Sequence, residues 1–144
     1  MNILIIDDNP RHLAAASEFG EHSVVTADSY ETAMEILAQG NTDILLTDML
    51  MPAEAFTLGE KGMLFFGHEM PIGFVLVLVA ARNGVKYAIM ATDTNHHDHP
   101  MSAGVDRICN YVYSIGGMKA WFTHAMLRPD GAKDWKRMFD LITQ

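Results

Sequence analysis

The chain has 144 residues, of which 49% are hydrophobic and 19% are charged, a composition typical of one globular domain and not of a disordered chain. The formal net charge of −8 repels nucleic-acid phosphates and argues against nucleic-acid binding. The single cysteine excludes an internal disulfide, and the longest apolar run, residues 74–81, is shorter than the roughly 20 residues that span a membrane. Because the N-terminus lacks the basic start of a targeting signal, we expect a cytoplasmic protein without membrane contact.

Short apolar runs alternate with amphipathic stretches along the chain. The apolar runs predict five strands, at residues 3–6, 23–27, 43–47, 87–92 and 119–124. The stretches that follow them predict five helices, at residues 10–19, 29–39, 71–83, 101–115 and 135–142.

Two of these helices depend on particular signals. Residues 74–79 would also suit a strand, but Asn83-Gly84 is a good helix stop and another strand follows at once. Residues 101–115 are predicted to be one helix because Gly116-Gly117 follows as a stop and apolar side chains recur at spacings of four and three. These side chains are Met101, Val105, Ile108, Val112 and Ile115.

Strands that alternate with helices imply an α/β fold with a parallel sheet and helices on both faces. For a doubly wound, flavodoxin-like sheet of five strands, one common order is 2-1-3-4-5, with the ligand site between strands 1 and 3. We therefore predict a single domain over residues 1–144. Its connection between the third strand and the next long helix, residues 49–70, is unusually long.

Carboxylates follow two strands that this order makes neighbours. Asp7 and Asp8 end the first strand, and Asp48 ends the third. Like charges that converge in one crevice raise one another's pKa unless a cation intervenes, and Mg²⁺ with oxygen ligands is the natural cation. The alternative is that these residues are solvated loop residues or helix caps.

Two segments resemble a known family. Residues 3–10, Ile-Leu-Ile-Ile-Asp-Asp-Asn-Pro, resemble the opening of response-regulator receiver domains. Residues 43–52, Asp-Ile-Leu-Leu-Thr-Asp-Met-Leu-Met-Pro, resemble the strand that carries their phosphoacceptor, with its D-x-x-M-P signature. The specific resemblance covers about residues 2–52, and the strand–helix order is receiver-like throughout.

The resemblance implies a role for each matching residue. Asp48 would be the phosphoacceptor, and Asp7 and Asp8 would hold Mg²⁺ together with Asp48 and the backbone carbonyl of Leu50. Thr92, at the end of the fourth strand, would be the switch hydroxyl that binds the phosphoryl oxygens.

The chain departs from the family at the lysine that follows the fifth strand, commonly before a proline. Arg128-Pro129 imitates that pair but lies farther along the chain, Lys133 is another candidate, and His124 closes the strand itself. Arginine does not reproduce the compact ammonium of lysine.

The long connection at residues 49–70 is a second departure. It begins beside Asp48 and contains Glu54, Glu60, His68 and Glu69. It could cover the site, offer an interaction surface, or have no chemical role, because loop insertions cost little.

A third departure is the histidine loop after the fourth strand. His96, His97 and His99 could bind a transition metal such as Zn²⁺ as a second metal site. Their close spacing equally suits a solvated loop or a helix cap before Pro100.

Three functions follow from these observations. The leading one is a stand-alone signalling domain that accepts a phosphoryl group on Asp48 from a histidine kinase or phosphotransfer protein and then contacts a downstream protein. Its chemistry would be at most its own phosphorylation and dephosphorylation. The alternatives are a pseudo-receiver, an interaction module that works without phosphorylation, and a metal-binding module built on the histidine loop.

Overall fold

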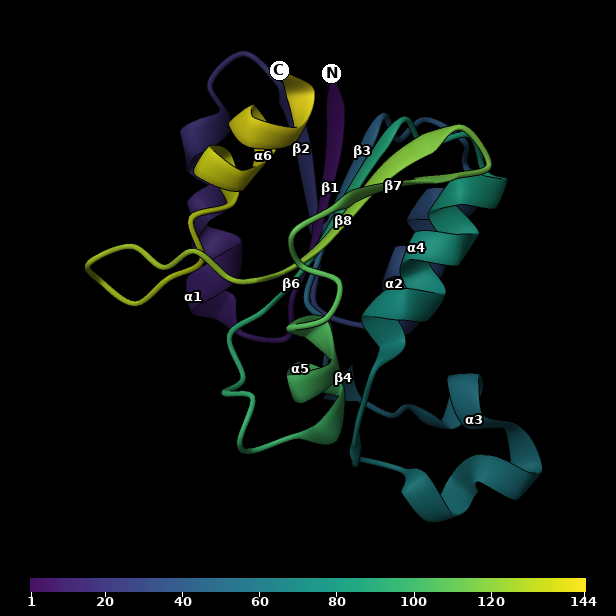
Figure 1. The fold of residues 1–144 in the computed structure, drawn as a ribbon. Coiled ribbons are helices and arrows are strands. Elements are labelled where there is room, and N and C mark those ends of the chain that lie inside the picture. The colour runs from purple at the N-terminus through teal and green to yellow at the C-terminus, as the bar shows by residue number, and fades with distance from the viewer.

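The structure is a computed structural model of residues 1–144, and it describes the side chains of residues 1–54 and 59–144. A six-stranded sheet runs through the centre of the molecule (Figure 1). In spatial order its strands are β2 (Ser23–Ala27), β1 (Asn2–Ile6), β3 (Ile44–Thr47), β6 (Tyr87–Thr92), β8 (Met118–His124) and β7 (Val112–Ile115). The first five are parallel, which confirms the predicted doubly wound order, but the antiparallel edge strand β7 makes six strands and not five.

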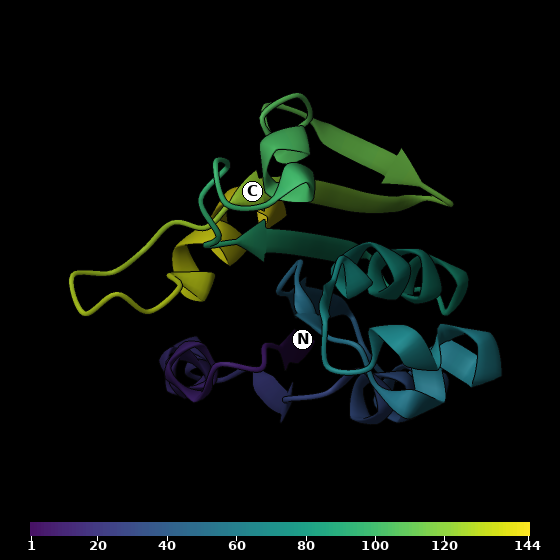
Figure 2. The same ribbon diagram turned by 90° about the horizontal axis from the view of Figure 1, so that it is seen from below.

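Helices cover both faces of the sheet (Figures 1 and 2). One face carries α2 (Tyr30–Ala38) and α4 (Ile72–Arg82), and the other carries α1 (Pro10–Leu13), the 3₁₀ helix η1 (Ala14–Phe19) and α6 (Trp135–Thr143). The short α5 (Pro100–Val105) lies beyond the carboxyl ends of the strands. Among the described residues, no helix has the length and apolar character needed to cross a membrane.

The core explains why residues 3–6 of β1 are all apolar. Leu4 and Ile6 pack into the cluster under α2 and α4, whereas Ile3 and Ile5 pack into the cluster under η1 and α6. A central parallel strand has no solvent face, so its sequence does not alternate. The last helix, α6, buries four apolar side chains, which are Trp135, Met138, Phe139 and Ile142.

The single helix predicted over residues 101–115 is wrong. The helix ends at Val105, and residues 112–115 form β7, which pairs with β8. Gly116 and Gly117 both have positive φ, 57° and 88°, and form the tight turn of this hairpin. The apolar spacing was misleading because Ile115 packs on the core from a strand, while Val112 is exposed. A glycine pair can form the turn of a hairpin as well as end a helix.

The long connection at residues 49–70 contains small elements of its own. Its two ends, β4 (Met51–Pro52) and β5 (Glu69–Met70), pair antiparallel and form a neck. Between them, α3 (Ala55–Gly62) and the 3₁₀ helix η2 (Met63–Phe65) project away from the sheet (Figure 1). The η2 end of this projection is apolar and open to solvent, and Leu64 is 85% exposed.

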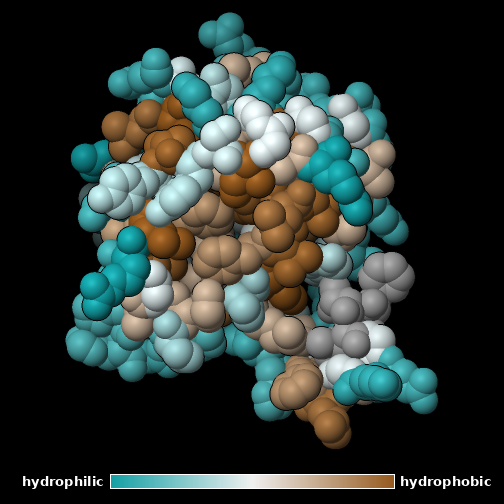
Figure 3. All heavy atoms as spheres, turned by 45° about the vertical axis from the view of Figure 1, so that its right-hand side comes forward, coloured by the Kyte–Doolittle hydropathy of each residue, from teal (hydrophilic) through white to brown (hydrophobic). Residues whose placement is uncertain are grey.

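A further apolar surface belongs to α4. Val75 and Leu78 lie on the outer side of this helix and are exposed. Figure 3 shows apolar side chains gathered on the side of the molecule that carries α4. The helix is apolar on nearly all sides because its inner side packs on the sheet and its outer side retains aliphatic residues.

The crossing of α4 over the end of β3 requires a glycine. The Gly73 amide donates to the Met49 carbonyl at 3.0 Å. A Cβ at Gly73 would collide with the Asp48 carbonyl oxygen and would lie 2.9 Å from the Met49 Cα. Gly73 therefore lets the helix approach the backbone that carries Asp48.

We expect Gly73→Ala to lower the free energy of unfolding by about 2–3 kcal/mol, because backbone must move to admit the methyl group. Urea denaturation measures this loss. Gly104→Ala is the matched control, since a Cβ there meets no atom within 4 Å. Equal stability of the two variants would contradict the close approach.

Candidate functional site

The sheet brings the three predicted aspartates together. Ile6 pairs with Thr47 in the parallel ladder of β1 and β3, so Asp7 and Asp48 leave the sheet side by side. The Asp48 amide donates to the Ile6 carbonyl at 2.8 Å and fixes this register. Ligand oxygens of Asp7, Asp8 and Asp48 all lie within 4.8 Å of one another.

A polar cavity of about 250 Å³ opens onto these carboxylates. Leu50, whose carbonyl the resemblance assigns to the cation, lines it, as does Glu69 from the neck of the long connection. Glu54, by contrast, accepts hydrogen bonds from the Tyr30 and Glu31 amides at 3.3 Å and so caps α2. The long connection therefore contributes the Glu69 carboxylate to the wall of the cavity and contacts α2 through the Glu54 carboxylate.

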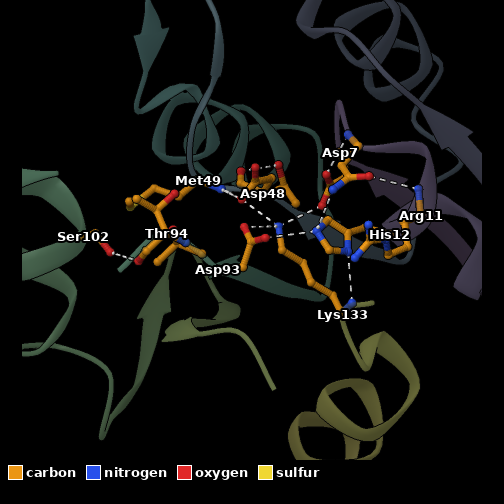
Figure 4. Close-up of polar contacts among 12 residues, drawn as sticks. Asp7, Arg11, His12, Asp48, Met49, Asp93, Thr94, Ser102 and Lys133 are labelled. Carbon is orange, nitrogen blue, oxygen red and sulfur yellow. Dashed lines mark hydrogen bonds and ion pairs between the residues drawn. The ribbon is translucent and has the colours of Figure 1, made fainter. Parts of the chain in front are cut away.

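Lys133 supplies the counter-charge of the site. Its Nζ lies 2.7 Å from Asp48 Oδ1, 2.8 Å from Asp7 Oδ2 and 3.5 Å from Asp93 Oδ1 (Figure 4). The side chains of Lys133 and Asp7 have no solvent exposure. Desolvation opposes the charge on Lys133, but the carboxylates of Asp48, Asp7 and Asp93 outweigh it and raise the pKa of the ammonium. Lys133 is therefore a buried cation shared by three acids.

The other two candidates for this position lie elsewhere. The Arg128 guanidinium pairs with Glu18 and Asp130. His124 Nε2 donates to Asp106 Oδ1 at 2.6 Å, outside the acidic cavity. The structure thus brings Lys133, and neither Arg128 nor His124, to Asp48.

A short excursion of the chain explains how Lys133 reaches the site from so far past β8. After β8 the chain runs outward and returns, with Leu127 paired antiparallel to Lys133 and the Asp134 amide donating to the Met126 carbonyl at 2.7 Å. This arm, residues 125–134, projects to one side of the sheet in Figure 1. Its return places Lys133 close to the end of β8 despite the extra residues.

Thr92 ends β6 and is buried. Its Oγ1 accepts a hydrogen bond from the Thr94 amide at 3.2 Å. The Thr94 carbonyl in turn accepts from the hydroxyl of Ser102, a buried residue of α5. Thr92 lines the cavity next to the acidic one, beside His96 and the end of β8.

Asp93 and His12 belong to the site although neither was predicted to be part of it. Asp93 follows Thr92 at a strand end, the same signal that identified Asp7 and Asp48, and could have been found by it. His12 lies inside a helix, 2% exposed, and its ring contacts Asp93 at 3.1 Å. Nothing in the local sequence distinguishes such a histidine from an ordinary core residue.

The carboxylates carry more negative charge than Lys133 offsets. Desolvation is the largest influence on Asp48 and raises its pKa to about 7, although Lys133 lowers it. Burial, and next the charge of Asp7, raises the pKa of Asp8 as well. Both shifts mean that a further positive charge in the cavity would be favourable.

The histidine loop does not form a ready metal site. His99 Nδ1 accepts a hydrogen bond from the Met101 amide at 3.1 Å and caps α5, which is the helix-cap alternative to metal binding. His96 Nδ1 lies 3.2 Å from Asp106, and the Nε2 atoms of His96 and His97 are 2.8 Å apart. Within the part of the chain whose side chains are described, the grouping suited to a metal ion is that of Asp7, Asp8 and Asp48.

We expect Lys133→Met to cost about 3–5 kcal/mol of unfolding free energy at pH 8, because it leaves buried carboxylates without their cation. Loss of the ammonium raises the already high pKa of Asp48 further. A raised carboxyl pKa lowers stability above that pKa and has no effect below the unfolded value of 3.8. The loss should therefore shrink at pH 5, as denaturation curves at both pH values would reveal.

Lys136→Met is the control for this experiment. Lys136 pairs with Asp140 at 2.6 Å on the surface of α6, so its loss should cost only about 0.3–0.5 kcal/mol at either pH. Similar losses in the two variants would mean that the buried cation is unimportant to stability.

Comparison with known proteins bears on the fold. No protein-family model matches the chain, and no curated protein matches its sequence. Among solved structures it is similar to the BeF₃-activated N-terminal receiver domain of Klebsiella pneumoniae RstA. The two are 16% identical, with a TM-score of 0.54 over 100% of this chain and 99% of that domain. The chain therefore has the fold of a response-regulator receiver domain.

Proposed function

We propose that the protein is a response-regulator-like signalling domain that accepts a phosphoryl group on Asp48. The observation that carries this proposal is the environment of Asp48, a buried carboxylate beside Asp7 and Asp8 that is bonded to the ammonium of Lys133 at 2.7 Å. A carboxylate oxygen of Asp48 attacks phosphorus, the bond from phosphorus to the donor breaks, and the donor leaves with that electron pair.

The residues present fit Mg²⁺. The donors are oxygens, the cavity wall is almost wholly polar, and the raised pKa values of Asp8 and Asp48 reflect a need for positive charge. Asp7, Asp8, Asp48 and the Leu50 carbonyl would hold the ion. When bound, Mg²⁺ supplies a positive charge that neutralises phosphoryl oxygens during transfer.

Lys133 supplies the second positive charge. Its ammonium already hydrogen-bonds Asp48 and is held charged by its neighbours. It would bind an oxygen of the incoming phosphoryl group and keep that oxygen close to the attacked phosphorus.

Thr92 is the proposed switch hydroxyl. Its link through Thr94 to Ser102 gives a continuous hydrogen-bonded route from the end of β6 to α5. A hydroxyl that turned toward a phosphoryl oxygen would give up the Thr94 amide and disturb the loop before α5. The output surface would then include α5 and the β7–β8 hairpin.

The phosphodonor would be a histidine kinase or a phosphotransfer protein, and the output a contact with a downstream protein in the cytoplasm. Asp93 favours the phosphorylation-independent alternative, because its carboxylate, 3.5 Å from Lys133 Nζ, adds negative charge where a phosphoryl anion must enter. The two functions differ in whether Asp48 is ever modified.

We expect the wild-type protein, incubated with Mg²⁺ and acetyl phosphate, to gain the mass of one phosphoryl group, and Asp48→Asn to gain none. Mass spectrometry of the intact protein measures this gain. Asp28→Asn, which alters an exposed aspartate just after β2, should behave as wild type. If neither acetyl phosphate nor a histidine kinase modifies the wild-type protein, the phosphorylation-independent function replaces this proposal.

Mg²⁺ affinity should rise with pH. The cation competes with the proton on Asp48, whose pKa is about 7, so binding strengthens by up to about tenfold per unit below that pKa and levels off above it. Calorimetric titration with Mg²⁺ between pH 5 and 8 tests this. Asp48→Asn should bind more weakly and lose the steep pH dependence; an unchanged slope would place the titrating group elsewhere.

A further inference from the structure

His12 is a buried histidine whose two ring nitrogens are both engaged at the edge of the acidic cavity. It comes from α1, yet it contacts two segments far away in sequence, the Lys133 backbone and the Asp93 side chain (Figure 4). A histidine that only filled space in the core would not need two such partners.

The first of these contacts assigns the tautomer of the ring. The Lys133 amide donates to His12 Nδ1 at 3.0 Å, so Nδ1 carries a lone pair and no proton. The proton of the neutral ring then sits on Nε2, which donates to Asp93 Oδ2 at 3.1 Å. His12 therefore accepts from the Lys133 amide and donates to the Asp93 carboxylate, and its Nε2 also lies 3.3 Å from the Asn9 side-chain amide.

The second contact closes a ring of interactions around Lys133. Asp93 Oδ1 lies 3.5 Å from the Lys133 ammonium. Partial burial opposes ionisation of Asp93, but the charge of Lys133 and the hydrogen bond from His12 lower the pKa of its carboxyl. Through His12 and Asp93, both the backbone and the ammonium of Lys133 are tied to the rest of the site.

Lys133 needs such an anchor because it does not sit at the end of a strand. The arm that carries it returns through a single β-bridge, and the Arg128 ion pairs to Glu18 and Asp130 hold only its outer part. Near the cavity, the backbone amide of Lys133 itself is held by His12.

We propose that His12 is a positioning residue that holds the Lys133 arm and orients Asp93, and thereby fixes the Lys133 ammonium over Asp48. This inference rests on the proposed phosphorylation of Asp48 for its catalytic consequence, but the anchoring itself is measurable without phosphorylation. His12 touches neither the phosphoryl group nor the cation in this role.

The test uses His12→Leu, which fills similar space without hydrogen bonds, and His12→Asn, whose amide oxygen can still accept from the Lys133 amide. His22→Leu is the matched control, because His22 lies outside the acidic cavity. The first measurement is hydrogen exchange of the Lys133 amide. We expect strong protection in the wild type, His22→Leu and His12→Asn, and its loss in His12→Leu. Retained protection in His12→Leu overturns the proposal.

The second measurement is the rate of phosphorylation by acetyl phosphate. In His12→Leu we expect a fall of roughly 100-fold, the scale of a 1 Å misplacement of a catalytic group, with partial recovery in His12→Asn. Mg²⁺ affinity should not fall, since the carboxylates remain. A parallel loss of Mg²⁺ affinity would mean that His12 supports the whole site and would overturn the specific role.

A double-mutant cycle tests whether His12 affects the rate through Lys133 or by supporting the whole site. In a Lys133→Ala background, adding His12→Leu should have little further effect on the rate, because the group it positions is gone. If His12→Leu and Lys133→Ala lowered the rate of phosphorylation independently of each other, the proposal would be overturned. If the wild type accepts no phosphoryl group, the proposed function fails, and the protection of the Lys133 amide alone decides whether His12 anchors the arm.

Discussion

One buried ammonium allows the acidic pocket to exist. Asp7 and Asp48 emerge from adjacent central strands with almost no solvent around them, and such charges would repel each other strongly without a cation between them. Lys133 meets both at hydrogen-bond distance. Its own burial is tolerable only because the same carboxylates surround it, so each member of the group makes the others possible.

Much of the fold follows from the hydrophobic pattern. The parallel strands could be identified because central strands of such a sheet are apolar throughout, as Ile3 to Ile6 and Ile44 to Leu46 are. The alternation of these strands with helices then implied a parallel sheet, and the order 2-1-3-4-5 is a common one for a doubly wound sheet of five strands. The pattern failed at residues 112–115, where Val112 and Ile115 match helical spacing although they belong to a short strand. The pairing partner of that strand, β8, lies beyond a glycine turn.

The site was predictable to the extent that strand ends define it. Asp7, Asp8 and Asp48 were identified because the carboxyl ends of neighbouring parallel strands meet at one edge. The sequence alone could not decide whether Lys133 or Arg128 provides the cation of the site. The position of Lys133 depends on how the arm folds back through the bridge between Leu127 and Lys133. His12 acts through contacts with segments 81 and 121 residues away, and no local pattern encodes them.

The distance along the chain between Asp7 and Lys133 has a consequence for biosynthesis. The two residues are 126 positions apart, so a growing polypeptide emerges with β1, β3 and β6 long before the arm. If β1 and β3 pair before Lys133 is available, Asp7 and Asp48 repel each other unless protons or dissolved cations take the place of its ammonium. The pocket is therefore completed late, when the arm docks and brings Lys133 to Asp7 and Asp48.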